Sequence, residues 1–218
     1  MKNLDIKKIL TDNIGAVLLY CFFFVGILGH LFQISRDFML ALTPYFLLIM
    51  GISVLIPTIK EKDWKVITWA VVVYIITLFL EIVGVHTGLI FGEYVYGPTL
   101  GLEFLGVPLV IGFNWTMVIL GALKLTDLIT DNRVIGALLA GSFAVVFDYI
   151  LEPVAMELDY WDWDIGTIPL QNYAAWFIIA LIFASAFKGL KLKTENMLLV
   201  HYLIAQTIFF LILRLALT

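Results

Sequence analysis

Seven apolar runs, each long enough to cross a lipid bilayer, dominate the sequence and leave little chain for anything else. A helix needs about 20 apolar residues to span the hydrocarbon core of a membrane. The runs that meet this length are residues 14–33, 37–57, 65–85, 106–123, 134–152, 172–188 and 196–216. The sequence therefore predicts an all-α, polytopic integral membrane protein, a bundle of about seven transmembrane helices that forms a single domain over residues 1–218.

The composition supports this class. Hydrophobic residues make up 62% of the chain, charged residues make up 14%, and the mean hydropathy is +1.04. These values lie far outside the range of soluble globular domains. The first run is longer than a signal-peptide core and has no small-residue cleavage site after it, so we expect it to remain as a helix. We expect no nucleic-acid partner, and the sequence leaves the oligomeric state open.

The basic residues predict the orientation of the helices. Threading seven helices places Lys2, Lys7, Lys8, Lys60, Lys62, Lys65, Lys124, Arg133, Lys188, Lys191 and Lys193 on one side. Only Arg36 and Arg214 fall on the other side. Cytoplasmic loops are enriched in Lys and Arg, so the sequence predicts a multi-pass protein of the cell membrane with a cytoplasmic N terminus. The two longest loops, 86–105 and 153–171, are then extracytoplasmic.

These two outer loops are rich in Gly, Pro, Trp, Tyr and acidic residues, and neither contains Lys or Arg. Gly and Pro break helices and favour tight or re-entrant backbone, which a membrane protein tolerates where protein covers it. The loop acids Glu157, Asp159, Asp162 and Asp164 are expected to form a solvated rim. Trp161 and Trp163 are expected to form a lid between that rim and the interior.

Three carboxyl groups fall near the outer ends of predicted spans. Glu81 and Asp148 each lie about one turn inside the outer end of a span, so they are expected at one depth. Glu152 follows Asp148 by one helical turn, which places both carboxyl groups on one helical face. Ionisable side chains inside a membrane are costly, so each one is a candidate for function. A structural role in helix packing remains the alternative for each of them.

Other polar side chains are expected in the same outer layer. Asn114 enters about two turns from the outer end of its span, next to Trp115, and His30 and His86 approach the same depth. This bias toward one half of the membrane predicts a pocket that opens toward the outer leaflet.

The residue types in this layer favour acid chemistry without a metal or a cofactor. The sequence has no paired histidine pattern for zinc or di-iron, no Lys in the last span for a retinal Schiff base, and no Gly-rich nucleotide loop. A carboxylic acid held in a low dielectric stays protonated near neutrality and can act as a general acid. Aromatic faces stabilise a cation, and a second carboxylate can orient a water molecule. Together these groups suit addition of water to an alkene.

Two segments resemble the membrane carotenoid-biosynthesis hydratases, of the bisanhydrobacterioruberin hydratase and carotenoid 1,2-hydratase type. The first is FGEYVYGPTLGLEFLGVPLVIGFNWTM, residues 91–117. The second follows the family pattern of Asp, an acid with Pro, a Tyr-Trp pair, Trp, Pro, Asn and Trp. It is matched by Asp148, Glu152, Pro153, Tyr160, Trp161, Trp163, Pro169, Asn172 and Trp176. The resemblance covers residues 80–178, and this chain has Glu152 where we expect Asp in the family.

The resemblance implies a cofactor-independent hydratase that acts on the terminal double bond of an acyclic carotenoid end group and forms a tertiary alcohol. The substrate would lie within the lipid bilayer, and other carotenoid-biosynthesis enzymes are possible partners. The candidate catalytic residues are Asp148, Glu81 and Glu152. The candidate substrate-binding residues are Tyr94, Tyr96, Asn114, Trp115, Trp161, Trp163, Asn172 and Trp176. Either Asp148 or Glu81 would protonate the double bond, and Glu152 or the remaining acid would direct the water.

Two other functions fit the same residues. An isoprenoid cyclase or isomerase shares the protonation step but loses a proton from the cation. A proton-coupled transporter would use Glu81 and Asp148 as a proton relay.

Overall fold

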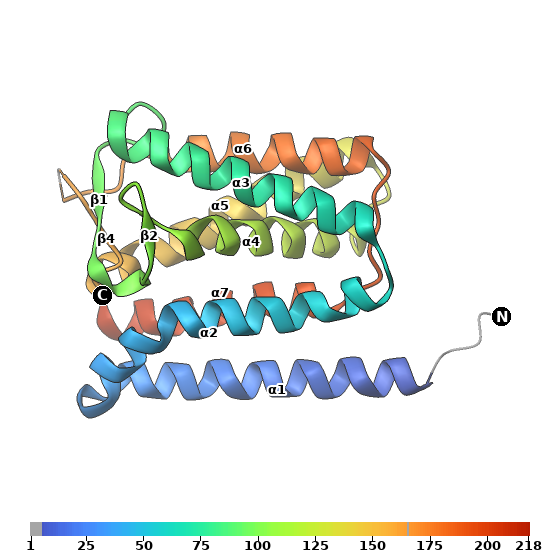
Figure 1. Ribbon diagram of the computed structural model, residues 1–218, viewed down its shortest axis with the longest axis horizontal. Helices are drawn as coiled ribbons and strands as arrows, with labels where there is room; N and C mark the ends of the chain where they lie inside the picture. The colour runs from blue at the N-terminus through green and yellow to red at the C-terminus, as the bar shows by residue number, and fades with distance from the viewer. Residues whose placement is uncertain (1–5, 165) are drawn as a thin grey trace.

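The computed structural model describes residues 6–164 and 166–218, and most of this part of the chain forms seven long helices (Figure 1). They are α1 (Ile6–Leu31), α2 (Gln33–Lys60), α3 (Trp64–Thr87), α4 (Leu109–Asp127), α5 (Arg133–Glu157), α6 (Leu170–Gly189) and α7 (Leu198–Leu217). All seven are long and apolar enough to cross a membrane. The predicted class, an all-α polytopic membrane protein, is confirmed.

The two ends of the bundle differ in composition. The basic connections between α2 and α3, α4 and α5, and α6 and α7 lie at the end where α1 begins (Figure 1). The loops that follow α3 and α5 lie at the opposite end, together with the C terminus (Figure 1). Lys2, which contributed to the predicted orientation, lies outside the described residues. The cytoplasmic position of the basic end stays a prediction.

Helix α4 lies at the centre of the bundle and packs against α2, α3, α5, α6 and α7 (Figure 1). Two glycines let its neighbours approach closely. A Cβ atom at Gly112 would lie 3.0 Å from the Tyr74 carbonyl oxygen of α3, and one at Gly121 would lie 2.8 Å from the Leu199 carbonyl oxygen of α7. Small residues at such positions are typical of helix packing in membranes. The close contacts at Gly112 and Gly121 hold α4 firmly against α3 and α7.

Helix α1 begins at Ile6 rather than 14, and the other helix bounds agree with the predicted spans to within five residues, with two instructive differences. Helix α4 begins at Leu109 rather than 106 because Val107–Pro108 forms strand β3, which pairs with β2 (Glu103–Phe104). Helix α5 ends at Glu157 rather than 152 because it continues through Pro153. Glu152 therefore lies within the helix and not at its exit.

An arginine from another helix compensates for Pro153. A proline inside a helix has no N–H for the carbonyl four residues earlier, which here belongs to Tyr149. The Arg214 guanidinium of α7 donates a hydrogen bond to that carbonyl and lies 4.4 Å from the centroid of the Tyr149 ring. Arg214 thus satisfies the freed carbonyl and adds a cation–π contact. This contact explains an arginine on the side that is otherwise poor in basic residues.

Replacing this arginine should destabilise the bundle. We expect Arg214→Met to lower the free energy of unfolding by about 1–2 kcal/mol, since it removes both the charged hydrogen bond and the cation–π contact. Thermal unfolding of the purified protein in detergent measures the change. Arg133→Met is the matched control because Arg133 is exposed at the start of α5. Equal melting temperatures for the two variants would contradict this role of Arg214.

A short two-stranded sheet covers the end of the bundle opposite the start of α1. Strand β1 (Tyr94–Tyr96) pairs antiparallel with β4 (Trp161–Trp163), although the two come from different loops (Figure 1). Side chains alternate between the faces of a strand. Val95 and Asp162 are exposed on one face, while the other face carries Tyr94, Tyr96, Trp161 and Trp163. We call this ribbon, β1 with β4, the aromatic lid. A 3₁₀ turn, η1 (Pro98–Leu100), follows β1 and packs on α2.

Candidate active site

A small cavity lies beneath the aromatic lid and contains most of the predicted site residues. Its volume of about 20 Å³ is close to that needed for one water molecule. It is lined by Glu81, Phe91, Tyr94, Tyr96, Ile111, Trp115, Asp148, Glu152, Trp161, Trp163, Asn172 and Trp176. Ten of the eleven candidate residues line it, and Asn114 does not. We call it the acid cavity, because three carboxyl groups that are each at most 3% exposed meet in it.

Glu152 is held entirely by N–H donors. Its Oε2 atom accepts hydrogen bonds from Nε1 of Trp161 at 2.9 Å and Nε1 of Trp163 at 2.8 Å. Its Oε1 atom accepts one from Nδ2 of Asn172 at 2.9 Å. Indole and amide N–H groups can only donate, so the three donors match an ionised carboxylate, which can only accept. Glu152 is therefore equipped to act as the anion of the site.

Asp148 receives less support from its surroundings. Nδ2 of Asn172 donates to Oδ2 of Asp148 at 2.8 Å, and this is the one hydrogen bond to the Asp148 carboxyl among the described residues. The same amide nitrogen thus joins Asp148 and Glu152, which lie one turn apart on α5. Because α6 brings Asn172 to both carboxyl groups, it fixes their relative position. Asp148 keeps an oxygen that is free to carry a proton.

Glu81 contacts a third kind of donor. Its Oε2 atom accepts hydrogen bonds from the hydroxyl groups of Tyr94 and Tyr96, the latter at 2.9 Å. Burial and the adjacent Glu81 carboxylate raise the pKa of both phenols well above the usual value. Both tyrosines therefore stay protonated at ordinary pH and remain donors. Strand β1 presents them on one face because they are two residues apart.

Stacked aromatic rings form the wall of the acid cavity. The rings of Trp115 and Trp176 stack with centroids 3.5 Å apart, and Phe91 also stacks with Trp176, at 5.0 Å. Tyr94 and Trp163 of the aromatic lid lie 5.0 Å apart. Aromatic faces attract cations, most strongly where water is excluded. The wall is therefore suited to a positively charged intermediate.

Three polar residues that were expected at the depth of the acids, Asn114, His30 and His86, lie outside the acid cavity. The Asn114 Oδ1 atom accepts a hydrogen bond from Nε2 of Gln206 at 2.6 Å, which links α4 to α7. His30 lines a separate apolar pocket, and His86 lines an outer cleft beside the lid. Their depth was predicted from position along a helix, but the direction of each side chain depends on helix rotation. The sequence cannot supply that rotation for a single polar residue.

The acidic residues of the outer loop lie at the surface, as expected for a solvated rim. The four loop acids Glu157, Asp159, Asp162 and Asp164 are all exposed.

Phe91 and Ile111 line the acid cavity but were not singled out from the sequence. Phe91 opens the segment that carries the family resemblance, which was the available signal. Among the described residues, no group of three or more His, Cys, Asp and Glu side chains is arranged to hold a metal ion.

Comparisons with known proteins identify the family of the chain. The bisanhydrobacterioruberin hydratase of Haloarcula japonica is 30% identical to the chain over an alignment of 151 residues, and the match covers 64% of this chain and 52% of the relative. The chain thus matches about half the length of this curated relative. No solved structure matches the chain. The family model described as carotenoid biosynthesis protein matches residues 42–218, from within α2 to the last residue. The chain therefore belongs to the carotenoid biosynthesis protein family.

Proposed function

We propose that the protein is a carotenoid hydratase of the cell membrane, which adds water to the terminal double bond of an acyclic carotenoid end group and forms a tertiary alcohol. The observation that carries this proposal is the acid cavity itself. Three buried carboxyl groups with unequal hydrogen-bond donors surround a space of about one water molecule, inside an aromatic wall. Membership of the family and the name of the relative supply the substrate class.

The hydrogen bonds favour Asp148 as the proton donor. Glu152 accepts three N–H donors and Glu81 accepts two hydroxyl groups, whereas Asp148 accepts only one donor among the described residues. A carboxyl group with few donors around it is the one best able to keep its proton in a buried site. Asp148 would give this proton to the less substituted carbon of the double bond. The other carbon then becomes a tertiary cation.

Glu152 would complete the addition. The water molecule bonds through its oxygen to the tertiary carbon, and the Glu152 carboxylate takes one of its protons. Transfer of that proton from Glu152 to Asp148, one helical turn away, restores both groups. The net reaction adds one water molecule and needs no further reactant. The aromatic rings that line the acid cavity would stabilise the cation, and the aromatic lid would keep other water away from it.

The mass of the product tests this function. In a bacterial host that makes lycopene, an acyclic carotenoid, expression of the chain should give a pigment heavier by one or two water molecules. Liquid chromatography with mass spectrometry measures this change against a host with an empty vector. A pigment with altered retention and unchanged mass would indicate a cyclase or isomerase. Unaltered pigment together with proton-dependent solute flux in vesicles would indicate a transporter.

A further inference from the structure

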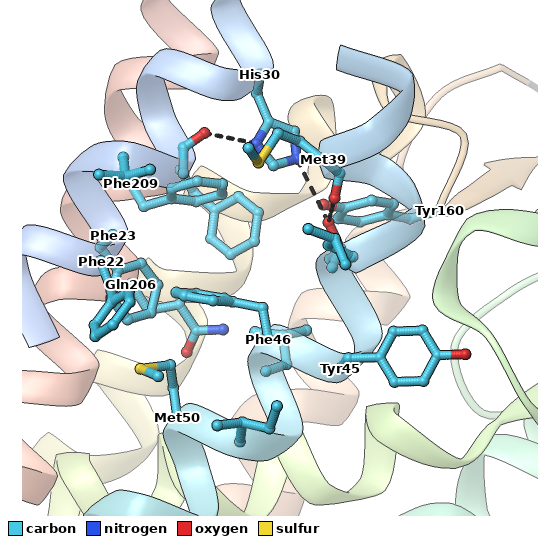
Figure 2. Close-up of a pocket in the computed structure, with 17 residues that line it drawn as sticks. Phe22, Phe23, His30, Met39, Tyr45, Phe46, Met50, Tyr160, Gln206 and Phe209 are labelled. Atoms are coloured by element: carbon cyan, nitrogen blue, oxygen red, sulfur yellow. Dashed lines mark hydrogen bonds between the residues drawn. The ribbon is translucent and has the colours of Figure 1, made fainter. Parts of the chain in front are cut away.

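A second, larger cavity lies between α1, α2 and α7 and is separate from the acid cavity (Figure 2). Its volume is about 410 Å³, and its walls are almost entirely apolar. Figure 2 shows Phe23, Phe46, Phe209 and Met50 around it, with Tyr160 beside one end. Other lining residues, such as Phe22, are exposed on the outer surface of α1, which faces the lipid in a membrane-spanning bundle. We call this cavity the lipid-side pocket.

Two buried polar atoms of the residues that line the lipid-side pocket, the Tyr160 hydroxyl and Oε1 of Gln206, have no hydrogen-bond partner among the described residues. Gln206 is 1% exposed and donates through Nε2 to Asn114, but its Oε1 atom is buried and accepts no hydrogen bond from the part of the chain that the structure describes. Figure 2 shows the amide group facing the pocket between Phe46 and Met50. A buried acceptor without a donor is costly, by about 1–3 kcal/mol. A stable buried water needs two to four polar partners, which the apolar wall around this amide does not offer.

Three aromatic rings in series connect the wall of the lipid-side pocket to the wall of the acid cavity. Phe210 lines the pocket, and its ring centroid lies 5.9 Å from that of Phe147. Phe147 in turn lies 6.4 Å from Trp115, which lines the acid cavity. The consecutive residues Tyr160 and Trp161 line the pocket and the acid cavity respectively. The two spaces are therefore neighbours.

We propose that the lipid-side pocket binds an isoprenoid alcohol, whose branched apolar chain enters from the bilayer and whose hydroxyl group donates a hydrogen bond to Oε1 of Gln206. The apolar walls suit the chain, and the unpaired acceptor requires a donor. The inference rests on the proposed function in one respect. Hydration of a carotenoid end group produces such an alcohol, so the pocket would receive the hydrated end after it leaves the acid cavity.

Photolabelling of the full chain tests this site without turnover. The probes are a C20 isoprenoid alcohol that carries a diazirine and the matching C20 hydrocarbon that lacks the hydroxyl, both in phosphatidylcholine vesicles. Mass spectrometry should map the alcohol to residues of the lipid-side pocket, with about tenfold more labelling than the hydrocarbon, as one hydrogen bond to an otherwise unpaired acceptor allows. Equal labelling by the two probes would overturn the proposal.

A second photolabelling experiment fills the lipid-side pocket with a larger side chain. Met50→Trp places an indole next to the Gln206 amide, so labelling by the alcohol should fall at least about tenfold. Leu48→Trp is the matched control, because Leu48 lies on the same helix, is exposed and does not line the pocket. Its labelling should stay within about twofold of the wild type. Unchanged labelling of Met50→Trp would overturn the assignment of the ligand to this pocket.

A double variant tests the hydrogen bond between the hydroxyl group of the alcohol and Gln206. The double change Asn114→Leu with Gln206→Leu removes both amide partners at once, which avoids leaving one buried and unpaired. It should bind the two probes equally, and its labelling by the hydrocarbon shows that the pocket is still formed. A retained preference for the alcohol would overturn recognition by Gln206. Absence of any carotenoid hydration by the wild type would refute the proposed function, but it would leave these labelling results unchanged.

Discussion

Asp148→Asn should abolish water addition to the carotenoid while leaving the protein folded in the membrane. Asparagine has the same shape as aspartate, and its side-chain oxygen can still accept the hydrogen bond from Asn172. It has no acidic proton, however, so the cation cannot form. Loss of a general acid lowers rates by about 10²–10⁴-fold. The amount of hydrated pigment per amount of protein in the membrane measures this loss.

Glu157→Gln is the matched control for this experiment. Glu157 is an acid on the same helix, but it is exposed on the solvated rim. Its replacement by the isosteric amide should leave product formation within about twofold of the wild type, as is usual for surface changes. Full activity of Asp148→Asn would exclude Asp148 as the proton donor and leave Glu81 as the remaining candidate for that role.

Glu152→Gln should cause the second-largest effect, and it should damage stability as well as activity. Three N–H groups converge on the Glu152 carboxylate, from Trp161 and Trp163 in the aromatic lid and from Asn172 in α6. In Glu152→Gln, an NH₂ group replaces one of the two carboxylate oxygens. This NH₂ group then faces an N–H donor and cannot accept its hydrogen bond. A buried donor left unpaired costs about 1–3 kcal/mol, and hydrogen bonds to charged groups are stronger than neutral ones. We expect a lower melting temperature and at least about a hundredfold loss of product.

Glu81→Gln provides the informative comparison, because its donors are of another kind. The hydroxyl groups of Tyr94 and Tyr96 can rotate and accept a hydrogen bond as well as donate one. The glutamine amide can therefore be accommodated, and the melting temperature should stay close to that of the wild type. Thermal unfolding in detergent measures both variants side by side. A larger loss of stability in Glu81→Gln than in Glu152→Gln would contradict the hydrogen-bond roles described above.

Pro153 in α5 shows the limit of local sequence rules for predicting where a helix ends. The apolar run of the predicted span ended at 152, directly before a proline, a residue type that usually breaks helices. In the structure, Arg214 satisfies the freed Tyr149 carbonyl and the helix continues to Glu157. The compensating residue lies on the last helix, far away in the sequence. Local sequence rules therefore could not predict the extension.

The aromatic lid shows the same limit for strands. Strands of three residues are too short to give a reliable alternating pattern, and β1 and β4 come from different loops. Their pairing sets Tyr94 opposite Trp163 and Tyr96 opposite Trp161. The sequence predicted that Trp161 and Trp163 form a lid, but it did not predict a sheet. It also did not predict that both indoles donate to Glu152.

The sequence by itself determined the class of the protein and one piece of the candidate site. Apolar runs of span length leave only helices as a way to satisfy the backbone in lipid, and the spacing of Asp148 and Glu152 on α5 puts them on one face in any such helix. Only the tertiary structure decided which donors reach each carboxyl group and that Asn172 joins two of them, while Asn114 turns toward Gln206. The reason is physical. Helix geometry fixes the relative positions of residues one turn apart, whereas contacts between helices depend on their rotation and packing, which the whole bundle sets together.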